Sequence, residues 1–175
     1  MRGRAARILA VGLLALGLGG CVFSERPLFD PAAAVTPAPA GRYEQQELIA
    51  GRWTKQREGA IKIEGRTYSW KPDNETEPAG FSVFPAGKDR FTVYARIVES
   101  GKPEHYYALL RKDANGYSIW QPTCGDFRKV RLPVNARPRA VKQNCFYDDR
   151  AKVTAALIAY ARAKPASFRY VALKP

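Results

Sequence analysis

The sequence is poor in the residues that usually carry catalysis and metal binding. It holds one histidine, His105, one methionine and three cysteines in 175 residues. A single histidine without a nearby cysteine or acidic pattern excludes a zinc site of ordinary ligand spacing. The G-x-S-x-G, S-x-x-K and H-E-x-x-H motifs are absent as well. We therefore expect no metal, no cofactor and no enzymatic activity. A cell-wall enzyme remains the third functional alternative, with Cys124 and His105 as a nucleophile pair that requires a free thiol.

Acidic residues are scarce too. The 16 Asp and Glu residues stand against 29 Lys and Arg residues, which gives a formal net charge of +13. A strongly basic protein is attracted to anionic surfaces such as lipid phosphates, peptidoglycan carboxylates or acidic polymers. The alternative interpretation is a solvated basic surface that aids solubility. No nucleic-acid partner is expected. The predicted anion-binding residues lie between the last two cysteines and are Arg128, Lys129, Arg131, Arg137, Arg139 and Lys142.

The apolar run from Ile8 to Leu18 is too short to span a bilayer, because a membrane helix needs about 20 residues. It follows three arginines, an arrangement typical of a signal peptide. The next residues, Leu18-Gly19-Gly20-Cys21, resemble the lipobox of bacterial lipoproteins, which signal peptidase II reads. This resemblance implies cleavage before Cys21, acylation of its thiol and anchoring in a membrane. The alternative is an ordinary signal peptide that is cleaved nearby.

The resemblance also predicts the location and the layout of the chain. Several acyl chains together make a practically permanent anchor, at about 0.8 kcal/mol per buried CH₂. Val22 stands where an Asp tends to retain such lipoproteins in the inner membrane, so we expect the outer membrane. The predicted parts are a signal peptide (1–20), a lipidated Pro/Ala-rich tether (21–40) and a β-rich domain (41–175). The mature chain keeps 26 basic and 16 acidic residues, a formal charge of +10.

The two remaining cysteines, Cys124 and Cys145, are an even number in an oxidising compartment. We predict a disulfide between them. In the chain-entropy model, closing this loop stabilises the folded protein by roughly 3 kcal/mol. Two free thiols are the alternative.

From residue 41 onward, short segments rich in aromatic and β-branched residues alternate with polar residues and turns. Asn115-Gly116 is a strong hairpin signal, and Glu104 to Leu110 is apolar on both faces, as in a central strand. A helix after Asp148 or Asp149 has apolar residues at helical spacing and ends at Pro165. The fold class is therefore mainly β: a single antiparallel meander barrel, or a strongly curved sheet, of about eight strands with a C-terminal amphipathic helix and a final strand. Lys129 to Val134 is a candidate edge strand.

Gly51-Arg52-Trp53 resembles the G-x-W motif of the first lipocalin strand, and the order of strands, helix and final strand is similar to that of a lipocalin. The resemblance implies that Arg162 or Arg169 packs on Trp53 and that the barrel binds small apolar ligands. The strand before the motif and the cysteine positions depart from the lipocalin pattern. The alternative is that the aromatic residues simply fill the barrel. The predicted cavity residues are Trp53, Tyr68, Trp70, Phe91 and Tyr107.

These observations favour a non-enzymatic, membrane-anchored envelope lipoprotein that binds an envelope component, such as the anionic polymers peptidoglycan or lipopolysaccharide. A lipocalin-like carrier of a small apolar ligand is the second alternative.

Overall fold

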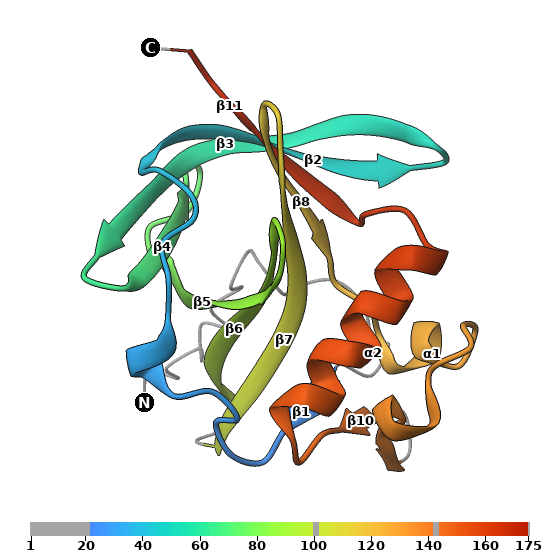
Figure 1. The fold of residues 1–175 in the computed structure, drawn as a ribbon. Coiled ribbons are helices and arrows are strands. Elements are labelled where there is room, and N and C mark those ends of the chain that lie inside the picture. Colours follow the sequence, from blue (N-terminus) through green and yellow to red (C-terminus); the bar gives the residue numbers. More distant parts are fainter. Residues whose placement is uncertain (1–21, 100–101, 142–143, 175) are drawn as a thin grey trace, which may run out of the picture.

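In the computed structural model, residues 22–99, 102–141 and 144–174 are described. Eight strands form a closed antiparallel barrel in the order β6-β5-β4-β3-β2-β11-β8-β7, and pairing of β6 with β7 closes it (Figure 1). The predicted mainly β fold with about eight strands is confirmed. The barrel strands are β2 (Gly41–Ile49), β3 (Arg52–Glu64), β4 (Thr67–Pro72), β5 (Ala79–Gly87), β6 (Arg90–Glu99), β7 (Lys102–Asp113), β8 (Gly116–Trp120) and β11 (Phe168–Ala172).

Successive side chains along β5 to β8 point alternately into the barrel and away from it, and they contribute to two separate hydrophobic cores. Leu110 and Ile119 point into the barrel, whereas their neighbours Leu109 and Trp120 belong to a second core on its outer face. Side chains in a strand point to opposite faces in turn, so a strand that is apolar on both faces separates two cores. This arrangement accounts for the run from Glu104 to Leu110.

The turn before β8 requires a glycine because of close packing. A Cβ atom at Gly116 would lie 1.9 Å from the carbonyl oxygen of Tyr170 in the neighbouring β11. The predicted hairpin between β7 and β8 forms with Ala114 and Asn115 as its turn residues, and Gly116, which pairs with Asp113, is the first residue of β8. The absence of a side chain therefore lets β8 pair with both β7 and β11.

The second core lies between the barrel and a layer of short elements. Besides the helix α2 (Arg150–Ala163), this layer has β1 (Val22–Ser24), which pairs in parallel with β10 and antiparallel with β7. The remaining short elements are η1 (Pro31–Ala33), α1 (Cys124–Phe127), η2 (Val134–Ala136), β9 (Arg139–Val141) and β10 (Asn144–Phe146).

The helix α2 lies where the sequence predicts it. Asp149 caps its N-terminus, because its side chain accepts a hydrogen bond of 3.0 Å from the Lys152 amide. Its buried face packs on the second core and consists of Val153, Ala156, Leu157 and Tyr160. The indole of Trp120 donates to the Lys164 carbonyl (2.9 Å), which fastens the end of the helix to β8. None of the helices in the described part of the chain is both long and apolar enough to cross a membrane.

The segment predicted as a Pro/Ala-rich tether packs against the barrel and the second core over its described residues, 22–40. Val22 and Phe29 are buried in the second core, and Ala38 is buried against the barrel core. A proline-rich segment makes few hydrogen bonds of its own, and here tyrosine side chains and neighbouring strands bind its backbone. Cys21 lies outside the described residues.

The candidate edge strand at Lys129 to Val134 does not form. A capping box at Thr123 starts α1 instead, and the edge strand is β9, ten residues further along. In this capping box the Thr123 side chain accepts from the Asp126 amide, and the Asp126 side chain accepts from the Thr123 amide. Both bonds satisfy backbone N–H groups at the helix start and stabilise a short helical turn at the start of this loop.

Candidate anion-binding cleft

A cleft of about 540 Å³ opens between the start of the described chain and residues that lie near the end of the disulfide loop and directly after it. Its wall carries four basic side chains, those of Arg26, Arg137, Arg139 and Lys152. Two acidic residues, Glu25 and Asp148, and the aromatic residues Phe146 and Tyr147 complete most of the lining.

Pairing of three short strands brings these distant residues together. Because β1 runs parallel to β10, with Phe23 opposite Phe146, the residues that follow each strand leave on the same side. Arg139 lies opposite Phe146 in the antiparallel pair of β9 and β10, and its guanidinium carbon is 5.2 Å from the centre of that ring. Lys152 comes from the first turn of α2.

Two of the four cations have an acidic partner. Arg139 Nη2 lies 2.8 Å from Glu25 Oε1, and Lys152 Nζ lies 3.0 Å from Asp148 Oδ1. Lys152 holds the pKa of Asp148 below its usual value, and Arg26 contributes to this effect. Exposed ion pairs of this kind contribute little to stability, so breaking them costs little free energy.

The cleft has an excess of positive charge. Within the described part of the chain, neither Arg26 nor Arg137 has a carboxylate within 4.0 Å in an ion pair. Both side chains are exposed. An arginine guanidinium presents several N–H donors in a plane and binds phosphate or carboxylate groups through two hydrogen bonds.

The six predicted anion-binding residues do not form one site. Arg137 and Arg139 line the cleft, whereas Arg128, Lys129 and Arg131 are exposed near α1 and do not line it. Lys129 Nζ is 3.5 Å from Asp126 Oδ1. Lys142 lies outside the described residues. Sequence reasoning missed Arg26 and Lys152, because nothing in the sequence indicates that β1 pairs with β10.

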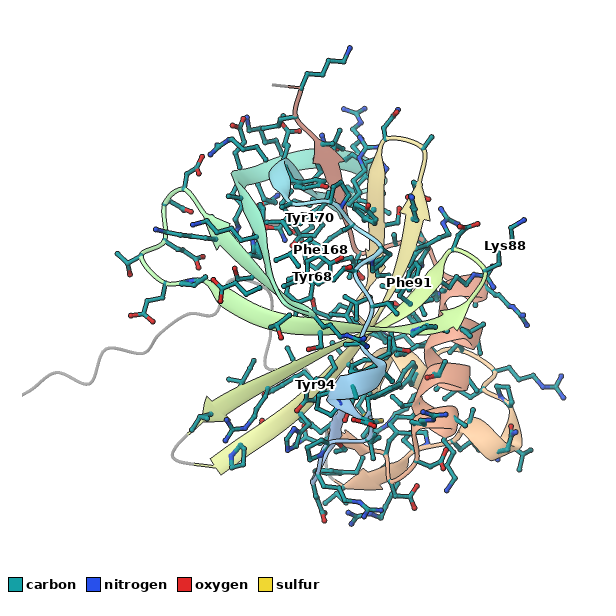
Figure 2. All side chains as sticks on the ribbon, turned by 60° about the vertical axis from the view of Figure 1, so that its left-hand side comes forward. Tyr68, Lys88, Phe91, Tyr94, Phe168 and Tyr170 are labelled. Atoms are coloured by element: carbon teal, nitrogen blue, oxygen red, sulfur yellow. A yellow bond between two sulfur atoms is a disulfide. The ribbon has the colours of Figure 1, made fainter. Side chains whose placement is uncertain are left out.

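The five predicted cavity residues are also distributed over different places. Tyr68 and Trp70 line a barrel cavity of about 30 Å³, which is far below the 300–1,000 Å³ typical of ligand pockets. Phe91 packs against the barrel core, whereas Tyr107 belongs to the second core, where burial raises its pKa to about 12. Trp53 packs on the outside of the second core. Figure 2 shows Tyr68 and Tyr170 above the green strand that crosses the view and Tyr94 below it.

One contact implied by the lipocalin resemblance is present. The guanidinium carbon of Arg169 lies 4.7 Å from the centre of the Trp53 ring, and the Nε atom of Arg169 donates to the Gln46 side chain. The other candidate, Arg162, is exposed in the last turn of α2.

The residues of the enzyme alternative are engaged in other contacts. Cys124 and Cys145 are buried at disulfide distance, with Cα atoms 5.1 Å apart, as expected for the predicted bridge. His105 Nδ1 lies 2.8 Å from the Tyr94 hydroxyl, and burial lowers the pKa of the imidazole. Among the described residues, no group of three or more His, Cys, Asp or Glu side chains is placed to hold a metal ion. Comparison with protein-family models, with curated proteins and with solved structures finds no match for this chain.

Proposed function

We propose that this chain is a lipid-anchored protein of the bacterial cell envelope that acts by binding and not by catalysis. Acyl chains on Cys21 hold it in the outer membrane, as the Leu18–Cys21 lipobox resemblance implies. The cleft that holds Arg26, Arg137, Arg139 and Lys152 binds anionic groups of an envelope component. The convergence of these four cations on one open cleft is the observation that carries the proposal.

The chemistry of the cleft favours phosphate or carboxylate groups. Arg26 and Arg137, which form no ion pair among the described residues, supply bidentate donors. The excess positive charge attracts polyanions, and salt weakens this attraction. Peptidoglycan and lipopolysaccharide both present such groups at the envelope. The small volume inside the barrel, about 30 Å³, further favours a surface site over a carrier function.

The lipid anchor is tested first. Cells that express the chain are grown with labelled palmitate, and we expect the label to appear on the protein and to be lost in the Cys21→Ser variant. The thiol is the atom that takes the diacylglyceryl group, so a serine removes the acceptor. Equal labelling of the parent and the variant would contradict the anchor.

The cleft is tested with the double variant Arg26→Ala/Arg137→Ala. Each basic side chain near an anionic surface contributes about 1 kcal/mol of binding free energy. We therefore expect the double variant to bind peptidoglycan or lipopolysaccharide at low salt roughly 10- to 30-fold more weakly than the parent. Pulldown on each material over a series of salt concentrations measures the loss of binding and shows whether peptidoglycan or lipopolysaccharide supplies the anionic groups.

The matched control is Arg52→Ala/Lys62→Ala. Both residues lie on β3, are exposed and make no ion pair within the described chain, so the net charge changes equally. If both double variants lose binding to the same extent, net charge and not the cleft is responsible. If the parent is not retained on either material at low salt, the proposal fails.

A further inference from the structure

A short stretch of the chain crosses the open end of the barrel. Residues 35–39 run from η1 to β2, and Figure 2 shows this segment in light blue in front of the barrel, beside Tyr68. The amide of Val35 donates to the Val83 carbonyl (2.8 Å), and Ala38 is only 6% exposed. The segment is therefore held in one defined position at the mouth of the barrel.

Three tyrosines from three different strands bind this segment. Tyr68 of β4 makes two hydrogen bonds to Ala38: its hydroxyl accepts from the amide (2.9 Å) and donates to the carbonyl (3.0 Å). The Tyr43 hydroxyl donates to the Pro39 carbonyl (3.0 Å). The Tyr117 hydroxyl donates to the Pro37 carbonyl (3.3 Å). Three consecutive carbonyls of the segment are thus bound by side chains of the barrel.

This pattern suits an extended Pro-Ala-Pro segment. Prolines have no backbone N–H, and a polyproline-type helix has no internal hydrogen bonds, so its carbonyls are free to accept from side chains. The single amide donor, that of Ala38, is the one that Tyr68 accepts. Pro37 and Ala38 also line the barrel cavity of about 30 Å³, which leaves room for only a small side chain at the middle position.

We propose that the mouth of the barrel is a binding site for extended Pro-Ala-Pro peptides, and that the chain's own residues 37–39 occupy it as the resident ligand. Aromatic grooves that bind preformed proline-rich segments are a recurring mode of peptide recognition. A partner's proline-rich segment binds here by displacing residues 37–39. The covalent link gives the resident segment an effective concentration in the millimolar range, so it blocks weak competitors. This site goes beyond the proposed function and shares no residue with the basic cleft.

The test is binding of a labelled synthetic peptide with the sequence of residues 33–40 to the purified full chain. In the variant Ala38→Glu, the longer charged side chain cannot enter the small buried space, so residues 37–39 dissociate from the mouth of the barrel. We expect this variant to bind the peptide at least tenfold more tightly than the parent, because the parent's site is filled. Fluorescence anisotropy gives the affinity, and circular dichroism checks that the barrel is folded.

Two controls make the result specific. Adding Tyr68→Phe to Ala38→Glu removes two hydrogen bonds to the peptide and should weaken its binding about tenfold. A peptide that carries glutamate at the position of Ala38 should not bind. If Ala38→Glu does not fold, Pro37→Gly/Pro39→Gly, which loosens the segment by making it flexible, takes its place. Binding no tighter than that of the parent, or unchanged by Tyr68→Phe, would overturn the proposal.

Discussion

Replacing Trp70 by alanine is expected to lower the free energy of unfolding by about 3–5 kcal/mol, the usual cost of truncating a large buried aromatic residue. Trp70 is 1% exposed inside the barrel, and its ring meets that of Tyr170 edge to face, with ring centres 5.1 Å apart. Gly59 lies directly against it, since a Cβ atom there would be 2.8 Å from the Trp70 ring. The surrounding backbone leaves little freedom for the cavity to collapse. Urea denaturation, followed by circular dichroism, measures the loss.

The matched control is Trp53→Ala, the same substitution outside the barrel. Trp53 is partly exposed and its ring lies under Arg169, so we expect a loss of about 1 kcal/mol, typical of an exposed cation–π contact. Equal losses in the two variants would show that Trp70 is not at the centre of a tightly packed core.

Removal of the disulfide is expected to cost about 3 kcal/mol. In the variant Cys124→Ala/Cys145→Ala, a loop of sequence separation 21 is no longer closed in the unfolded chain, whose conformational entropy rises. Both cysteines are buried, and Cys145 is the register partner of Val22, so β1 depends on the strand that the bridge holds. The thermal unfolding midpoint should fall accordingly.

Comparison of reduced and oxidised protein separates the bond from the residues. In a Cys21→Ser background, reductant should lower the unfolding midpoint of the parent and leave that of the alanine variant unchanged. If the reductant has no effect on the parent, the two cysteines are not bonded in the folded protein. Alkylation without reductant, followed by mass spectrometry, counts the free thiols independently.

Features that depend on neighbours in sequence were predictable. The Asp149 cap and the apolar spacing that begins at Val153 define α2, and the stretch from Asp113 to Gly116 contains the turn before β8. The alternation of apolar and polar residues depends only on the two faces of a strand. For the same reason, the run that is apolar on both faces fits the place of β7 between the two cores.

Features that depend on long-range pairing were not predictable. Arg26 and Arg137 are 111 residues apart in the sequence and share a cleft only because β1 pairs with β10. The proline-rich segment is predicted as a tether. It is bound to the barrel only because closure of the barrel brings Tyr43, Tyr68 and Tyr117 close together, although β2, β4 and β8 are not neighbours in the sheet.

The sequence by itself determined the strand character, the main helix, the cysteine pairing, the strong positive charge and the resemblance to a lipobox. Each of these is a property of residue type or of local spacing. The tertiary structure alone decided which arginines share a cleft, how little space the barrel encloses and where the proline-rich segment binds. These outcomes depend on which strands become neighbours, and many pairings satisfy the same local pattern of apolar and polar residues.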